Sequence, residues 1–418
     1  MAAAFAAVAQ ILSKILQGRN LDNAMQSIDV PAMVRASVVD MTYNTLRAYG
    51  RGEMLLDLLL SRSLKQHEIQ SLLLVALWRL EEKPTDRHTT VDQAVTAAGV
   101  LARGRFRNLV NGVLRNYLRR EDELKEAISA HDEAQWHYPR WWIEKLRSAY
   151  PQEWESILIA GNSHPPLSLR VNKRITSVTA YSQILTDNGM AIAVEGAWGL
   201  RLLKPVGVDA IPGFHKGVIS VQDLGAQHTA ALLDLQTGQR VLDACAAPGG
   251  KTAHIMEWAD VEMLALEAEP KRAQRIHENL DRLHLHAQVK VTDCRHVDQW
   301  WDGRSFDRIL ADVPCSASGV VRRHPDAKYL RRPEDVYSFA ATQREIIDAL
   351  WPVLAPGGKM LYCTCSVFPE ENGQQIAAFL ERHPDAERMM IAGQDELQLL
   401  PNADHDGFYF ALLRKRAP

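Results

Sequence analysis

Apolar residues recur every three to four positions through roughly the first 130 residues, which is the spacing of one buried helical face. This pattern predicts helices over residues 33–49, 54–60, 69–80 and 109–118, and an amphipathic helix at the very start of the chain. The stretch TVDQ at residues 90–93 has the S/T-x-x-E/Q form of a capping box, which predicts that a helix begins there. The region is therefore expected to form an all-α helix bundle.

A different pattern begins near residue 160. The segments PPLSLRVNK (165–173), GMAIAVEG (189–196) and GLRLLKPVG (199–207) are short, rich in strand formers and punctuated by glycine and proline. The aromatic stretch WHYPRWWIEKL (136–146) precedes them. We expect a small α+β domain here, which the aromatic stretch opens.

From about residue 217 onward, buried-strand candidates alternate with helical stretches. The candidates are RVLDA (240–244), EMLALE (262–267), AQVKVTD (287–293), FDRILADV (306–313) and GKMLYCTC (358–365). This alternation predicts βαβ units with right-handed crossovers, and therefore a parallel sheet.

Composition narrows the class of protein. The 418 residues are 46% hydrophobic and 24% charged, as in soluble globular proteins of two or three domains. Apolar runs fall short of the roughly 20 residues that a membrane helix needs. The net charge of −3 means that any nucleic-acid partner must be met by local basic patches. The five cysteines have neither disulfide-framework nor zinc spacing, which favours a reducing cytoplasm and predicts no metal site.

Acidic side chains end four successive predicted strands: Asp243, Glu267, Asp293 and Asp312. Open parallel sheets bind ligands at this edge, and a carboxylate there can hold a ribose diol. After the first strand, Pro248, Gly249 and Gly250 form a turn that lets the backbone approach a ligand at a helix N-terminus. A P-loop would need glycine at position 245, which is Cys245. The pattern predicts a nucleoside cofactor without phosphates.

Three motifs now point to one family. DACAAPGGKT, DVPCSASG and YCTCS, in this order and on these strands, resemble the motif set of the NOL1/NOP2/Sun family of RNA cytosine-5 methyltransferases, which use S-adenosylmethionine. The resemblance covers roughly residues 140–415, and the helical region resembles the NusB-like RNA-binding domain. It implies three domains: a NusB-like helix bundle (1–135), a small α+β domain that links or binds RNA (136–215), and a Rossmann-like methyltransferase domain with a mostly parallel seven-stranded sheet (216–418).

The family chemistry assigns roles to the cysteines. A thiolate adds to carbon 6 of cytosine, carbon 5 then attacks the methyl group, and elimination frees the enzyme. The resemblance implies that Cys365 is the nucleophile, Cys315 assists product release, and Asp312 bonds the cytosine ring or the cofactor side of the pocket. DNA methyltransferases would instead attack from the Pro-Cys motif at Cys315. Cys363 is expected to serve packing alone.

The same resemblance implies the cofactor residues. Glu267 would hold the ribose, with Glu269 as the alternative, and Asp293 would read the adenine, while Lys251 is open to either cofactor or base. The methionine end would lie against the glycine-rich turn. The implied set is Cys245, Ala246, Ala247, Pro248, Gly249, Gly250, Lys251, Glu267, Asp293 and Asp312.

Two basic stretches are expected to meet RNA phosphates. RGRFRN places Arg103, Arg105 and Arg107 beside Phe106, and VVRRHPDAKYLRRP (320–333) follows the Pro-Cys motif with five basic residues, among them Arg322 and Arg323.

The resemblance implies methylation of cytosine 967 in 16S rRNA, before or early in small-subunit assembly, by a monomer that needs no membrane. The alternatives are the same reaction on tRNA, or a non-catalytic RNA-binding assembly factor. The motif cysteines and Asp312 speak against the latter, since a binding module needs none of them. DNA methylation fits poorly, because Cys365 would then have no role.

Overall fold

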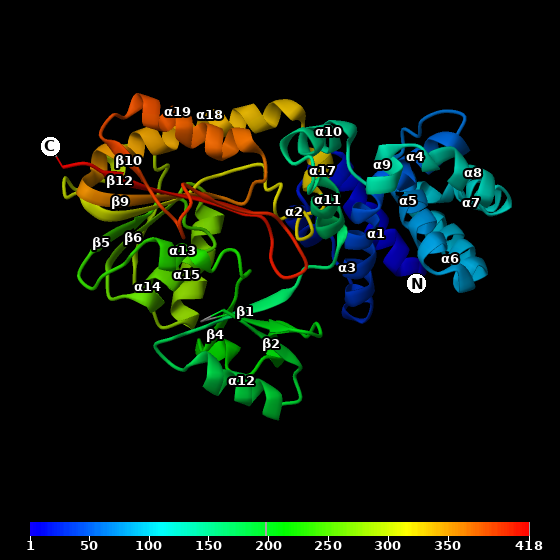
Figure 1. Cartoon of the computed structure of the whole chain (residues 1–418). Coiled ribbons are helices and arrows are strands. Elements are labelled where there is room, and N and C mark those ends of the chain that lie inside the picture. The colour runs from blue at the N-terminus through cyan, green and yellow to red at the C-terminus, as the bar shows by residue number, and fades with distance from the viewer. Residues whose placement is uncertain (197–198, 418) are drawn as a thin grey trace. The chain divides into compact units, whose positions relative to one another are not determined.

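The computed structural model describes residues 1–196 and 199–417. It contains two compact units. One combines Met1–Ser163 with Val321–Pro333, and the other combines His164–Val320 with Glu334–Pro418 (Figure 1). Among the described residues, no helix is long and apolar enough to cross a membrane.

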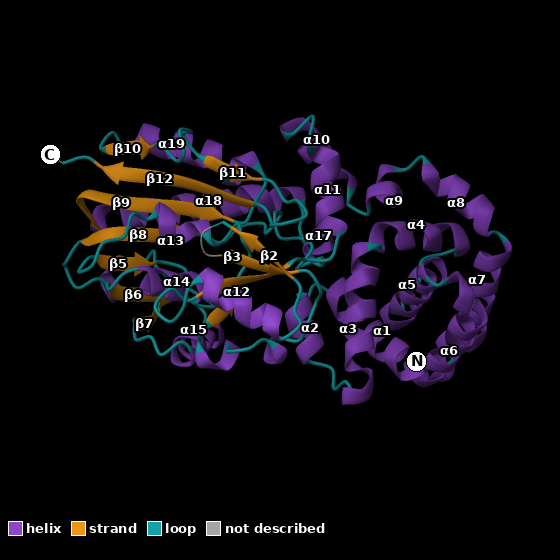
Figure 2. Ribbon diagram, turned by 60° about the horizontal axis from the view of Figure 1, so that its bottom comes forward, coloured by secondary structure: helices purple, strands orange, loops and turns teal. Residues whose placement is uncertain are grey.

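The first unit is helical throughout (Figure 2). Its helices are α1 (Ala2–Leu16), α2 (Leu21–Gln26), α3 (Ala32–Arg47), α4 (Tyr49–Leu59), α5 (His67–Glu82), α6 (Arg87–Val100), α7 (Arg107–Arg119), α8 (Glu121–Ser129), α9 (Asp132–Trp136), α10 (Arg140–Ala149), α11 (Trp154–Asn162) and α17 (Ala327–Leu330). The apolar faces of α1 and α5 form the centre of the core, with Phe5, Leu12, Leu72 and Leu77 almost fully buried. The predicted helix bundle is confirmed.

One helix start was predicted wrongly. Helix α6 begins at Arg87, directly after a 3₁₀ turn over Pro84–Asp86, so the TVDQ stretch lies inside the helix. The Thr90 side chain is fully buried against the core and does not cap a terminus. A capping-box pattern does not by itself separate an exposed cap from a buried threonine within a helix.

The segment 321–333 leaves the second unit and folds into the helical one. The Lys328 side chain is fully buried there, and its Nζ donates to the backbone oxygens of Arg47 (3.0 Å) and His137 (2.9 Å) and to Oδ1 of Asn162 (2.9 Å). Three oxygen acceptors are what an ammonium group needs when it leaves water. Lys328 therefore anchors this segment inside the helical unit.

The compact helical unit extends beyond residue 135, where the sequence predicts a domain division; that division stays a prediction. Helices α10 and α11 belong to the helical unit, where Trp142 and Leu146 are buried and Asn162 Nδ2 donates to the backbone oxygen of Trp136 at 2.7 Å. The aromatic stretch thus closes the helical unit, and the β-rich segment begins after it.

The second unit opens with a small antiparallel sheet. In the described residues this sheet has four strands in the order β2 (Ile192–Glu195), β3 (Gly199–Leu202), β1 (Leu167–Val171) and β4 (Ile219–Val221). Helix α12 (Val178–Asp187) packs on it through Tyr181 and Leu185. Ser177 caps this helix by accepting a hydrogen bond from the backbone N–H of Ala180. The predicted α+β region is confirmed.

The main sheet follows the alternation of the sequence. Its strands run in the order β10 (Ala386–Met389), β12 (Phe408–Lys415), β9 (Leu354–Thr364), β8 (Phe306–Asp312), β5 (Arg240–Asp243), β6 (Glu262–Glu267) and β7 (Gln288–Val291). The pairs from β9 to β7 are parallel, whereas β12 pairs antiparallel with β9 and β10. The described part of the sheet holds an eighth strand, β11 (Leu397–Leu399), beside β12, where seven were expected.

Helices cover both faces of this sheet (Figure 1). Successive strand residues alternate between two cores, as in Val241 and Leu242 of β5. One core is closed by α16 (Val297–Trp300), α18 (Pro333–Leu350) and α19 (Gly373–Arg382), and the other by α13 (His228–Leu232), α14 (Gly250–Trp258) and α15 (Pro270–Arg282). This doubly wound arrangement leaves the carboxyl edge of the parallel strands for ligands.

Candidate active site

The four predicted carboxylates meet at one edge of the main sheet. Asp243, Glu267 and Asp312 are the last residues of β5, β6 and β8, and Asp293 lies two residues beyond the end of β7. These strands are parallel neighbours in the order β8, β5, β6 and β7, so their ends form one row. Asp243 and Glu267 are almost fully buried.

The turn from Cys245 to Lys251 joins β5 to α14 in a fixed shape. Gly249 has φ +96°, and a Cβ atom there would lie 3.1 Å from Cα of Ile276, so this position requires glycine. Gly250, the first residue of α14, instead faces open space. Asn279 Nδ2 donates to the backbone oxygen of Pro248 at 2.8 Å, which further fixes the turn. The result is a rigid, open cradle beside a helix N-terminus.

Arg170 holds this turn from the small sheet, a contact that was not predicted from the sequence. Its guanidinium is 1% exposed and forms a two-pronged ion pair with Glu257 of α14, at 2.8 and 2.9 Å. The remaining nitrogen, Nη1, donates to the backbone oxygen of Gly250 at 2.9 Å. The residue lies in the segment PPLSLRVNK, where an arginine within an otherwise uncharged strand was the available signal.

Glu267 and Asp293 are placed differently. Glu267 Oε1 accepts hydrogen bonds from the backbone N–H of Glu269 (3.0 Å) and from Arg272 (3.4 Å), while the Glu269 side chain is exposed. Asp293 is held by Arg295 at 2.7 Å, and this hydrogen bond lowers the pKa of its carboxyl. Both carboxylates therefore stand at the sheet edge, with Asp293 already neutralised in part.

Two thiols face each other across neighbouring strands. Cys315 follows β8 and Cys365 follows β9, and their sulfur atoms lie 3.3 Å apart. The hydrogen bond with Cys365, then burial and the charge of Glu371, raise the pKa of Cys315. Either thiol can donate a hydrogen bond to the other across this distance.

Asp312 lies beside this pair, between a cation and a third thiol. Its Oδ2 accepts from Lys251 Nζ at 2.6 Å, and its Oδ1 accepts from Cys363 Sγ at 3.2 Å. Burial lowers the pKa of Lys251, but Asp312, by its charge and its hydrogen bond, together with Cys363 and Cys365 raises it by more, so the net direction is upward. Cys363 was expected to serve packing alone; the structure adds a hydrogen bond to Asp312.

The remaining cysteines lie to one side. Cys294 is buried. Its hydrogen bond with Cys245 is the main cause that raises the pKa of the Cys245 thiol, and burial of that thiol is the second. Cys245 is therefore protonated and a poor nucleophile. Within the described residues, no group of three or more His, Cys, Asp or Glu side chains could hold a metal ion.

The predicted RNA contacts all lie in the helical unit. Arg103, Arg105 and Arg107 are exposed, and Arg103 has φ +57° in a tight turn before α7. Arg323 is half-buried. Arg322 is only 1% exposed, and Lys328 is buried, which disagrees with the expectation that these two meet phosphates. The segment was predicted from its charge and from its place after the Pro-Cys motif, and neither shows which basic side chains are structural.

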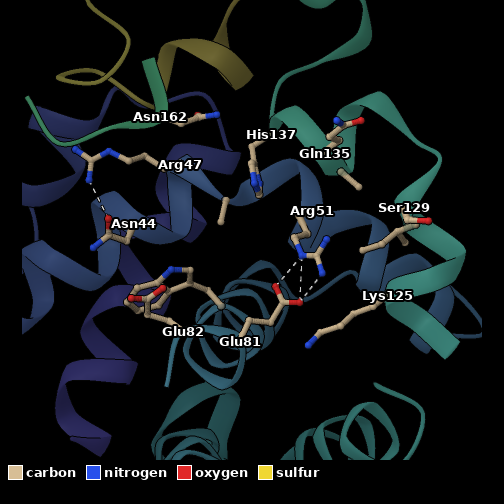
Figure 3. Close-up of a pocket in the computed structure, with 14 residues that line it drawn as sticks. Asn44, Arg47, Arg51, Glu81, Glu82, Lys125, Ser129, Gln135, His137 and Asn162 are labelled. Atoms are coloured by element: carbon tan, nitrogen blue, oxygen red, sulfur yellow. Dashed lines mark hydrogen bonds and ion pairs between the residues drawn. The ribbon is translucent and has the colours of Figure 1, made fainter. Parts of the chain in front are cut away.

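A cavity of about 700 Å³ also lies in the helical unit, between α3, α4, α5, α8 and α9 (Figure 3). Arg51 on its wall pairs in two-pronged fashion with Glu81 at 2.8 and 2.9 Å, and Lys125 pairs with Glu121 at 2.6 Å. The positive charge of the lining is thus largely neutralised, so the cavity offers little attraction to a phosphate.

The fold and the sheet edge define the class. A doubly wound sheet, a glycine turn open to a ligand, and a carboxylate at the end of the second strand fit S-adenosylmethionine, and this is an S-adenosylmethionine-dependent methyltransferase. Family models match in three parts: the NusB family over residues 2–119, the ferredoxin-like domain of RsmF/B-like methyltransferases over 138–209, and 16S rRNA methyltransferase RsmB/F over 230–414.

Curated relatives match over nearly the whole chain. Ribosomal RNA small subunit methyltransferase B of Erwinia tasmaniensis is 41% identical, and that of Vibrio cholerae is 40% identical, each with 98% of this chain and 97% of the relative aligned. The chain belongs to the RsmB/F family of 16S rRNA methyltransferases.

Solved structures share the fold. The crystal structure of PH0851 has a TM-score of 0.85 at 21% identity and covers 99% of both chains. NSun6 from Pyrococcus horikoshii, solved with the S-adenosylmethionine analogue SFG, has a TM-score of 0.60 at 19% identity, over 67% of this chain and 99% of its own.

Proposed function

We propose that this enzyme methylates carbon 5 of a cytosine in 16S rRNA, cytosine 967, through a covalent bond between Cys365 and the base. The relatives named above are small-subunit rRNA methyltransferases, which supports the substrate. The observation that carries the chemistry is the 3.3 Å approach of the Cys315 and Cys365 sulfur atoms, beside Asp312. A methyltransferase acting on a base nitrogen or a ribose oxygen needs no such pair.

In this proposal the residues divide the work. The thiolate of Cys365 adds to carbon 6 of a cytosine flipped out of its stack, which makes carbon 5 a nucleophile. S-adenosylmethionine, held by the turn 245–251 and by Glu267 and Asp293, supplies an electrophilic methyl group. Asp312, fixed by Lys251 and Cys363, accepts a hydrogen bond from the cytosine amine or bonds the cofactor side of the pocket.

The contact between the two thiols gives Cys315 a part in the reaction. In this proposal Cys315 is the protonated member of the pair, and the 3.3 Å contact lets its S–H stabilise a thiolate on Cys365. Cys315 then assists release: a base takes the carbon 5 proton, the electron pair of that bond restores the double bond between carbon 5 and carbon 6, and Cys365 leaves as the thiolate.

The helical unit is proposed to bind rRNA through Arg103, Arg105 and Arg107, with Arg323 as a further contact. We propose that a monomer meets 16S rRNA in the cytoplasm, before or early in small-subunit assembly. Lys251 is proposed to position Asp312, because its Nζ already donates to that carboxylate.

The substrate is tested by incubating the protein with methyl-labelled S-adenosylmethionine and, separately, unassembled 16S rRNA, assembled small subunits, tRNA and duplex DNA. Mass spectrometry then identifies the labelled nucleoside and its position. The proposal predicts 5-methylcytidine at position 967 of unassembled 16S rRNA. Label in tRNA would move the substrate and keep the chemistry. Intact cofactor binding without label in any RNA would favour a non-catalytic assembly factor.

A further inference from the structure

A buried carboxylate is bonded to the residues that follow the two thiols. Glu371 ends a short 3₁₀ turn (Pro369–Glu371) six residues after Cys365, and its side chain is fully buried. Charged side chains are buried at high cost unless hydrogen bonds satisfy them, so the partners of this carboxylate indicate its purpose.

The partners are the residues next to each cysteine. One oxygen of Glu371 accepts the backbone N–H of Ser316 at 2.7 Å, and the other accepts the Ser316 hydroxyl at 2.5 Å. That second oxygen also accepts the hydroxyl of Ser366 at 2.5 Å. Ser316 directly follows Cys315, and Ser366 directly follows Cys365. A single carboxylate thus joins the two loops that carry the thiols.

Neighbouring side chains fix Glu371 itself. Gln343 of α18 donates to Glu371 Oε1 at 3.2 Å and to the backbone oxygen of Pro314 at 2.9 Å. The hydroxyl of Tyr362 donates to the Glu371 backbone oxygen at 2.6 Å. Ser318 completes the set, since its hydroxyl lies 2.9 Å from that of Ser366 and accepts from the backbone N–H of Val367 at 2.9 Å. The loops are therefore tied at several points around one acid.

We propose that Glu371 is a positioning residue that sets the spacing of the Cys315 and Cys365 thiols. It acts through its hydrogen bonds to Ser316 and Ser366 and not through a bond to either sulfur atom. Burial raises the pKa of Glu371, whereas its hydrogen bonds from Ser316 and Ser366 lower it and so favour the carboxylate. Bonds from both loops to a carboxylate are stronger than bonds to a neutral amide. The inference rests on the proposed function. In that function the spacing of the two thiols matters twice, when Cys365 adds to the base and when it is released.

Substitution separates the two features of the side chain. Glu371→Ala leaves the Ser316 N–H and both hydroxyls without this acceptor and should loosen both loops. Glu371→Gln keeps one oxygen for the Ser316 N–H, and the hydroxyls can turn to accept from its amide, so the loops should stay closer to their native positions. Asp385→Asn is the matched control, because Asp385 accepts from Trp351 Nε1 just before β9 begins, at the far end of the strand from the thiols.

Two readouts are needed. The first is the yield of a Cys315–Cys365 link made by dibromobimane, a short bifunctional thiol reagent, and measured by peptide mass spectrometry without RNA or cofactor. The second is the single-turnover rate of methyl transfer to 16S rRNA at saturating cofactor. Affinity for S-adenosylmethionine, measured by calorimetry, shows whether each variant is folded.

Glu371→Ala should lower the link yield at least about fivefold and the single-turnover rate about 100-fold, with cofactor affinity nearly unchanged, since small misplacements cost that much. Glu371→Gln should fall between it and the wild type, and Asp385→Asn should match the wild type. If Glu371→Ala keeps both the link and the rate within about twofold, the proposal is wrong.

Should Glu371→Ala fail to bind cofactor, the Ser316→Ala/Ser366→Ala double variant takes its place under the same criteria. Failure of the proposed function looks different. The wild type would then transfer no methyl group to rRNA. The yield of the Cys315–Cys365 link in the wild type and in the variants would still decide the role of Glu371.

Discussion

The guanidinium of Arg170, in the small four-stranded sheet, donates a 2.9 Å hydrogen bond to the backbone oxygen of Gly250, at the start of α14. The same side chain pairs with Glu257, further along α14. The small sheet therefore does more than precede the methyltransferase sheet along the chain. It supplies a buried side chain that fixes the turn assigned to the cofactor.

Removal of Arg170 should damage both stability and cofactor binding. Arg170→Ala leaves the carboxylate of Glu257 buried without its partner, which costs about 3–5 kcal/mol of unfolding free energy. Urea denaturation and calorimetric titration with S-adenosylmethionine measure the two effects. Arg170→Met/Glu257→Leu should recover stability without recovering cofactor affinity. Full affinity in this double variant would show that the bond to Gly250 is unimportant.

The pair of Lys251 and Asp312 should behave as one unit in catalysis. Lys251→Met and Asp312→Asn should each lower kcat about 100-fold, because each leaves the other charge in a half-buried site without its partner. The double variant should lose little more than either single variant, giving a coupling energy above about 1 kcal/mol. Additive losses in kcat would mean that the two side chains act independently.

Asp243 should make stability depend on pH. Burial, opposed by the Thr252 hydrogen bond and aided by the charge of Asp312, raises the pKa of Asp243 to about 7. The folded state therefore holds this proton more tightly than the unfolded state, whose aspartates titrate near pH ~4. The stability it contributes is complete below about pH 4 and is lost as pH rises through about 7.

Asp243→Asn, which resembles the protonated acid, should remove this dependence. Between about pH 5 and pH 7 the wild type should lose up to about 1.4 kcal/mol per pH unit more than the variant, measured by urea denaturation. Asp260→Asn, at an exposed carboxylate of the same unit, is the control. Equal slopes for wild type and Asp243→Asn would contradict the raised pKa.

The exposed arginines should govern the salt dependence of RNA binding. Replacing Arg103, Arg105 and Arg107 by alanine should flatten the slope of log affinity against log salt concentration by about 2–3, since each phosphate contact contributes somewhat less than one unit. Filter binding of 16S rRNA fragments at several salt concentrations measures the slope. Arg140→Ala/Arg147→Ala, on another part of the helical unit, should leave it nearly unchanged.

Periodic patterns predicted most of the architecture. The spacing of apolar residues predicts the helices of the first unit and the strands β5, β6, β8 and β9. A helix with one buried face repeats its apolar residues every three to four positions, and a strand buried on both faces is a short apolar run. Asp243, Glu267 and Asp312 were predictable as one row, because each ends a buried strand and the ends of parallel strands share an edge. Asp293 lies two residues past its strand, a shift that strand-end patterns do not resolve.

Contacts between distant segments could not be predicted from such patterns. The destination of residues 321–333, the burial of Lys328 and Arg322, and the bond from Arg170 to Gly250 depend on packing partners far away in sequence. A basic residue looks the same in the sequence whether it binds a phosphate or satisfies three buried oxygens. Glu371 was visible in the stretch LYCTCSVFPEEN, but its bonds to both cysteine loops appear only in three dimensions.

The measurement that tests the central claim most directly is trapping of the covalent intermediate. Purified wild type, Cys315→Ala and Cys365→Ala are incubated with 16S rRNA and S-adenosylmethionine, denatured, and resolved by gel electrophoresis to detect protein linked to RNA. Cys315→Ala should accumulate a stable adduct, because release is blocked, whereas Cys365→Ala should form none and methylate nothing. An adduct in Cys365→Ala, and none in Cys315→Ala, would reverse the roles of the two cysteines.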